Sequence, residues 1–94
     1  MKEHVYRFRV ILADLEEVSE DAAEALYEAG CDDGLCGSSE GIADVMFDRE
    51  AKSLDEAVRT AVRDVRKAGF QVARIEIDRD DLEHLIQVPA TANS

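Results

Sequence analysis

The sequence predicts a single small α+β domain in which two helices cover one β-sheet. Its 94 residues suit one domain and leave little room for a second. Its hydrophobic content of 46% is typical of a folded protein and too high for a disordered one. Four strand-like segments and two segments with helical periodicity occur in the order strand, helix, strand, strand, helix, strand.

The first strand is predicted over residues 4–13, which are rich in β-branched and aromatic residues. Apolar residues recur at every second position, so one face of the strand should be buried. That face carries Tyr6, Phe8, Val10 and Leu12, and the opposite face carries Arg7, Arg9 and Ile11.

The first helix is predicted to begin after Ser19 and to end at Gly30. The Ser19 hydroxyl can accept a hydrogen bond from an amide of the first turn, and the acids that follow it suit the positive end of the helix dipole. Gly30 can adopt the left-handed conformation of a C-cap. The apolar stripe expected to face the sheet consists of Ala22, Ala25, Leu26 and Ala29.

A turn-rich segment follows and contains a short strand predicted near residues 35–38. Ser39, Glu40 and Gly41 are typical of a hairpin turn, after which residues 42–48 should form the third strand. In this strand Ala43, Val45 and Phe47 alternate with Asp44, Met46 and Asp48.

The second helix is predicted to begin after Ser53, with Glu56 completing a capping box, and to end at Gly69. Its apolar stripe consists of Leu54, Val58, Ala61, Val62, Val65 and Ala68. The last strand is predicted over residues 71–78. One of its faces should carry Ala73, Ile75 and Ile77, and the other Val72, Arg74 and Glu76.

This order is that of the ferredoxin-like βαββαβ fold, a four-stranded antiparallel sheet with two helices on one face and the two long strands side by side in its middle. We expect residues 1–79 to form this domain and residues 80–94, acidic and then polar, to form a partly disordered tail. The open sheet face, meaning the face without helices, should carry Arg7, Arg9, Ile11, Asp44, Met46, Val72, Arg74 and Glu76.

The charge is acidic overall and unevenly distributed. Asp and Glu number 22 against 11 Lys and Arg, which gives a net charge of −11. No Lys or Arg occurs between Arg9 and Arg49, so the acidic excess is concentrated in residues 10–48. Such a chain is poorly suited to nucleic acid or to an anionic membrane, and we expect neither as a partner.

Like charges follow one side of each predicted helix. The two rows are Glu20, Glu24 and Glu28 in the first helix and Arg59, Arg63 and Lys67 in the second. The rows can pair within the chain, because the fold lays the helices side by side. Alternatively the acidic row, together with Asp32 and Asp33, is a docking surface for a basic partner.

The open sheet face also favours a protein partner. A sheet that binds RNA stacks bases on exposed aromatic side chains, but Tyr6 and Phe8 belong to the helix-covered face. Cross-strand ion pairs should instead join Arg7 and Arg9 to Asp44 and Asp48. Because the face is partly apolar at Ile11, Met46 and Val72, a second copy or another protein could cover it.

No arrangement typical of catalysis or cofactor binding occurs in the sequence. It contains no nucleophile elbow, phosphate loop or nucleotide fingerprint. Cys31 and Cys36 are not spaced as a redox pair, and a zinc site would need His4 and His84, which lie near the chain ends. We predict no enzymatic activity, no catalytic residue, no metal and no cofactor.

One stretch resembles a known family. The residues that carry the resemblance are Ala25, Leu26, Glu28, Ala29, Gly30, Cys31, Asp32, Asp33, Phe47, Arg49, Glu50, Ala51 and Ser53. They resemble the N-terminal domain of small bacterial helix-turn-helix proteins of unassigned function, over about residues 5–78. The resemblance implies a part in a regulatory or antitoxin-like system. The residues after 78 are too few and too acidic for the helix-turn-helix, so DNA binding is not expected here.

Within this pattern, Arg49 joins a strand to a capped helix and can pair with Asp48 or Asp33. We interpret it as a structural residue rather than a ligand-binding one, since polar turns more often shape the chain than bind.

These observations predict a cytoplasmic, non-enzymatic interaction or oligomerisation module whose partner is a second copy or another protein. The residues expected to contact the partner are Ile11, Asp44, Met46, Glu20, Glu24, Glu28, Asp32 and Asp33. The alternative is a small-ligand-sensing regulatory domain, similar to the ACT domain, that uses the loops at residues 14–19 and 30–41.

Overall fold

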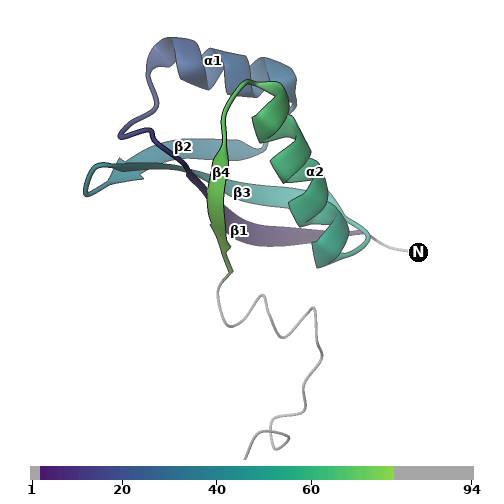
Figure 1. The fold of residues 1–94 in the computed structure, drawn as a ribbon. Helices are drawn as coiled ribbons and strands as arrows, with labels where there is room; N and C mark the ends of the chain where they lie inside the picture. The colour runs from purple at the N-terminus through teal and green to yellow at the C-terminus, as the bar shows by residue number, and fades with distance from the viewer. Residues whose placement is uncertain (1–2, 78–94) are drawn as a thin grey trace, which may run out of the picture.

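The computed structural model describes residues 3–77 of the chain. Six elements follow one another in the predicted order (Figure 1). They are β1 (His4–Leu12), α1 (Glu20–Ala29), β2 (Gly34–Ser39), β3 (Ile42–Ala51), α2 (Leu54–Lys67) and β4 (Val72–Glu76). The tail predicted over residues 80–94 lies outside the described residues.

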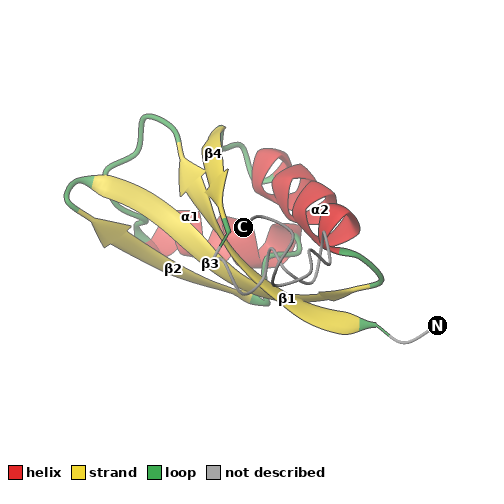
Figure 2. Ribbon diagram, turned by 90° about the horizontal axis from the view of Figure 1, so that it is seen from below, coloured by secondary structure: helices red, strands yellow, loops and turns green. Residues whose placement is uncertain are grey.

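The four strands form one antiparallel sheet in the order β2-β3-β1-β4. The two long strands β1 and β3 lie side by side in the middle, and both helices lie on one side of the sheet (Figures 1 and 2). The predicted α+β ferredoxin-like fold is therefore confirmed.

The hydrophobic core lies between the sheet and the helices. Phe8 of β1 and Phe47 of β3 are directly paired across the strands, and their rings stack with centroids 5.5 Å apart. From the helix side the core receives Leu26 of α1 and Leu54, Ala57, Ala61 and Val65 of α2. The alternation in the sequence thus buries one face of each long strand, as predicted.

Both helices begin at the predicted serine caps. The Ser19 Oγ accepts a hydrogen bond from the Ala22 amide at 3.1 Å, and the Ser53 Oγ accepts one from the Glu56 amide at 3.1 Å. α1 ends at Gly30, whose φ of 119° is in the left-handed region that favours glycine.

The hairpin between β2 and β3 also forms as predicted. Its two turn residues, Glu40 and Gly41, have φ values of 53° and 77°, the positive values of the tight turn that matches strand twist. β3 continues to Ala51, beyond the predicted end at residue 48. It does so because β1 begins at His4, which pairs with Ala51 and extends the ladder.

One prediction about the last strand is wrong. Val72 was expected on the open sheet face, but it packs against the helix-covered core. The cause is a β-bulge, a register shift between Ile11 and Leu12 that places Val72 opposite the buried Leu12. Arg74 and Glu76 lie before this shift on the ladder and remain opposite Ile11 and Arg9 on the open face.

Candidate functional site

The open sheet face carries three of the residues predicted to contact a partner. The strand register places Ile11 of β1 opposite Asp44 of β3, and Arg9 opposite Met46. On the other side of β3, Met46 is opposite Leu35 of β2. The fold thus gathers Ile11, Asp44 and Met46 on one surface formed by all four strands.

The charged side chains of this face form ion pairs with one another. Arg7 Nε lies 2.7 Å from Asp48 Oδ1, and Arg9 lies 3.8 Å from Asp44 and 3.7 Å from Glu76. Arg74 Nη2 lies 3.2 Å from Glu76 Oε2. The predicted cross-strand pairs of Arg7 and Arg9 are therefore present. Three arginines face three acids, so these six charges cancel, and the exposed Glu50 of β3, opposite Val5, adds one further acid to the face.

Apolar side chains remain exposed on the same face. Leu35 is 75% exposed, and Val5 and Ile42 are also accessible to solvent. Ile11 differs, since it is only 4% exposed and forms part of the lining of a shallow hollow with Arg9, Ile42, Asp44 and Arg74. A partner would meet Leu35 and Ile42 directly, and Ile11 only through this hollow.

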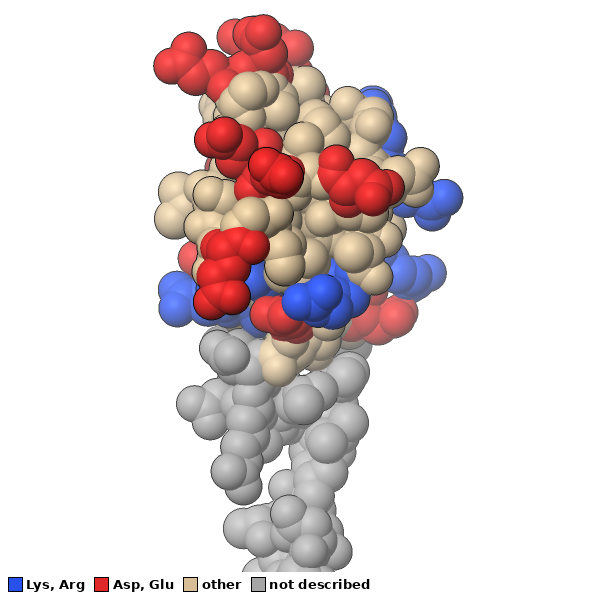
Figure 3. All heavy atoms as spheres, turned by 60° about the vertical axis from the view of Figure 1, so that its left-hand side comes forward, with Lys and Arg blue, Asp and Glu red and all other residues tan. Residues whose placement is uncertain are grey.

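The acidic row of α1 does not pair with the basic row of α2, so the pairing of the two rows within the chain, one of the two predicted alternatives, is wrong. Arg59 contacts Asp55, and Arg63 contacts Asp64, both within α2. No ion pair between residues 3 and 77 joins the two helices. Glu20, Glu24 and Glu28 remain exposed, and Figure 3 shows acidic side chains across the upper part of the molecule, where α1 lies.

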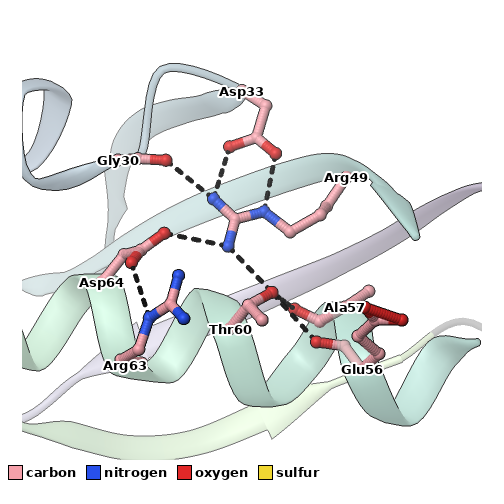
Figure 4. A network of polar contacts seen from close by, with 8 residues as sticks. All are labelled: Gly30, Asp33, Arg49, Glu56, Ala57, Thr60, Arg63 and Asp64. Atoms are coloured by element: carbon pink, nitrogen blue, oxygen red, sulfur yellow. Dashed lines mark hydrogen bonds and ion pairs between the residues drawn. The ribbon is translucent and has the colours of Figure 1, made fainter. Parts of the chain in front are cut away.

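Asp33, the other acid predicted at a docking surface, is instead bound to a buried arginine (Figure 4). Arg49 Nε donates to Asp33 Oδ2 at 2.7 Å, and its Nη2 donates to Asp33 Oδ1 at 2.9 Å and to the Gly30 carbonyl at 2.8 Å. Its Nη1 donates to Thr60 Oγ1 and to Asp64 Oδ2, both at 3.1 Å. Asp32, in contrast, is exposed.

This arrangement occupies all five N–H groups of the Arg49 guanidinium. The guanidinium also lies over the Phe47 ring, 5.0 Å from its centroid. The hydrogen bonds to Asp33 raise the pKa of Arg49 against the opposing effect of burial. Arg49 therefore ties the end of α1 to β3 and α2 and has no donor left for a ligand, as its structural interpretation predicted.

The sequence indicated two acids as possible partners of Arg49. Asp33 is bound to it, whereas Asp48 pairs with Arg7. Thr60 and Asp64 were not anticipated. Asp64 is a buried acid next to Val65 in the apolar stripe of α2. A carboxylate in such a stripe indicates a buried cationic partner. This feature of the sequence could have identified Asp64 as a partner of Arg49.

The two cysteines are free thiols on the core side of the molecule. Burial, followed by the nearby carboxylate of Asp64, raises the pKa of the Cys31 thiol to about 11. Burial and Asp44 raise the pKa of Cys36 as well. Both thiols are therefore protonated at neutral pH and poorly nucleophilic. In the part of the chain that the structure describes, no group of three or more His, Cys, Asp or Glu side chains could hold a metal ion.

The loop expected to bind a ligand in the alternative interpretation contributes to this network as well. Both the Gly30 carbonyl and the Asp33 carboxylate at the start of residues 30–41 are bonded to Arg49.

Between residues 3 and 77, neither helix is long and apolar enough to cross a membrane.

Comparison of the chain with protein-family models, with curated proteins and with solved structures gave no match.

Proposed function

We propose that the chain is a non-enzymatic interaction module that associates with a second copy of itself through the open sheet face. The observation that carries this proposal is a surface on which ion pairs neutralise six charges and leave only a small acidic excess, on a chain with a net charge of −11. Two strongly acidic molecules repel each other, so they can associate closely only where the local charge is balanced.

The distribution of apolar side chains supports the same surface. Leu35 and Val5 are among the most exposed large hydrophobic residues, and both lie on the open face with the half-buried Met46. Ferredoxin-like sheets have one side without helices, and burying exposed apolar side chains there stabilises an assembly by about 25 cal/mol per Å² before the costs of association.

The polar residues support a non-enzymatic role. Arg49 is saturated by its own network, and the Cys31 thiol is protonated at neutral pH. As part of the same proposal the module acts in the cytoplasm, where its thiols stay reduced. The resemblance of residues 5–78 to the non-DNA domain of small bacterial regulators is consistent with a module that holds copies together.

The proposal is tested by replacing Leu35 with Glu and measuring the molar mass by light scattering after size exclusion. The added carboxylate would be buried against the second copy, so Leu35→Glu should break the sheet contact and lower the measured mass. Ser38→Glu adds the same charge to the other face of β2, opposite the buried Ala43, and is the matched control, which should keep the wild-type mass. A wild-type mass of 10.4 kDa, that of one chain, at every concentration would contradict the proposal.

A thermal-shift screen with amino acids, nucleotides and divalent ions separates this proposal from a ligand-sensing role. An interaction module should show no ligand-dependent rise in melting temperature. A saturable rise with one of these compounds would favour the ligand-sensing alternative.

A further inference from the structure

The outward side of α1 combines acidic side chains with an exposed aromatic ring. Glu20, Glu24 and Glu28 lie four residues apart, and Tyr27 lies on the same strip of the helix. Tyr27 is 65% exposed although a tyrosine ring is a large apolar surface. Like charges at this spacing repel each other, and no basic residue of α2 offsets them. The strip therefore destabilises α1 in the isolated chain.

The outward side of α2 has the opposite character. Val58 and Val62, one helical turn apart, line a shallow groove with Arg59, Arg63 and Arg66. The three arginines are exposed, and the contacts of Arg59 and Arg63 are with acids of their own helix. This is a small apolar surface surrounded by guanidinium groups on a chain that is otherwise acidic.

The two strips complement each other in charge, and each combines its charges with an apolar surface. An aromatic ring beside carboxylates matches an apolar groove beside guanidinium groups, and Tyr and Arg are the residues that most often dominate protein interfaces. Within one chain the strips do not meet, because Tyr27 is exposed and Arg59 and Arg63 contact acids of their own helix. They can meet between two copies.

A two-fold axis fits this arrangement. α1 and α2 contact each other within one layer. A two-fold axis that runs between them in the plane of contact places α1 of each copy over α2 of the other. The same contact then forms twice and closes the assembly.

We propose that the helix layer is a second self-association surface, at which Tyr27 of one copy enters the Val58–Val62 groove of another while glutamates of α1 face arginines of α2. The inference rests on the proposed self-association and adds to it. With the sheet contact alone the chain forms dimers. Because the helix layer and the open face lie on opposite sides of the sheet, the helix contact links these dimers into larger assemblies.

The test uses charge reversal at one residue of each strip. Glu24→Arg and Arg66→Glu should each weaken the helix contact at least tenfold and lower the mass of the assembly to that of the sheet dimer, because each places like charges against each other. An equimolar mixture of the two variants should restore the wild-type mass, since every contact in the mixed pair again joins opposite charges. Glu16→Arg makes the same change at an exposed acid outside α1 and should keep the wild-type mass.

The sheet contact and the helix contact can be tested separately. If only the helix contact exists, Leu35→Glu leaves the mass unchanged and Glu24→Arg yields single chains. If only the sheet contact exists, Glu24→Arg leaves the mass unchanged, and this result overturns the inference. A mixture of the two charge-reversed variants that stays at the mass of its components overturns it as well.

Discussion

Arg49 shows how a single charged residue can be buried in a small acidic domain. Its side chain is 9% exposed and that of Asp64 is 8% exposed, so their pairing takes place largely away from water. Burying such a pair is favourable only when the remaining hydrogen-bonding groups are also satisfied, and here Asp33, Thr60 and the Gly30 carbonyl complete the set. The tight pairing explains why Asp33 is a structural acid and Asp32 is not.

Replacing Arg49 with Ala should lower the free energy of unfolding by about 3 kcal/mol, because Asp64 would remain buried without a cationic partner. The matched control is Arg74→Ala, which removes an exposed ion pair with Glu76 and should cost less than about 1 kcal/mol. Urea denaturation at one fixed low protein concentration measures both. Equal stability of the two variants would show that the buried network of Arg49 stabilises the fold no more than an exposed ion pair does.

The Cys31 thiol predicts an alkaline loss of stability. Its pKa is about 11 in the folded chain against an ordinary value of 9.0, so the unfolded chain loses this proton first as the pH rises. The free energy of unfolding is therefore unaffected by this group below about pH 9. It falls by up to about 3 kcal/mol between pH 9 and 11. Denaturation of the wild type and of Cys31→Ala over this range isolates the effect, and parallel curves for the two proteins would refute it.

Elements of secondary structure were predictable where the signal is local. The serine caps, the hairpin turn and the alternation of β1 and β3 depend on neighbouring residues, and all of them form as expected. The bulge that moves Val72 to the core arises from pairing between β1 and β4, which are far apart in the sequence. The partnership of Arg49 with Asp64 is likewise long-range, so the sequence offered only a set of candidate acids.

The junction after α1 depends on Gly30 for two separate reasons. Its φ of 119° is unfavourable for other residues, and a Cβ there would lie 2.7 Å from Asp64 Oδ2, which Arg49 holds in place. Gly69 also has a positive φ, of 100°, but a Cβ there would meet no atom within 4 Å.

Gly69→Ala should therefore cost about 1 kcal/mol for backbone strain alone. Gly30→Ala should cost about 1–2 kcal/mol more, because the carboxylate must move. Thermal or urea denaturation of the two variants gives the comparison. A Gly30→Ala variant as stable as Gly69→Ala would mean that the carboxylate of Asp64 moves freely.

The charges of the whole molecule are arranged by surface. The open sheet face has only a small acidic excess, the outward strip of α1 is acidic and the outward strip of α2 is basic. The sequence indicated that the acidic excess lies within residues 10–48, and the structure adds that the two helices do not neutralise each other. Charges that are not neutralised within the chain make most contacts between copies unfavourable. They allow contact only where opposite charges or a nearly neutral face meet.

The surfaces should therefore respond differently to salt. The contact between the helices depends on opposite charges, and at about 1 M salt the screening length falls to about 3 Å. The sheet contact depends on apolar side chains and internally paired charges, so it should persist. High salt thus isolates the association that the proposed function requires.

The function proposed for this chain is self-association through the open sheet face. Its most direct test is the molar mass of the unmodified chain, measured by light scattering over a concentration series at about 1 M salt, where helix contacts are screened. A chain that associates through the open face should give a mass that rises from the 10.4 kDa of one chain and levels off at twice that value. A mass that stays at 10.4 kDa throughout the series would contradict it.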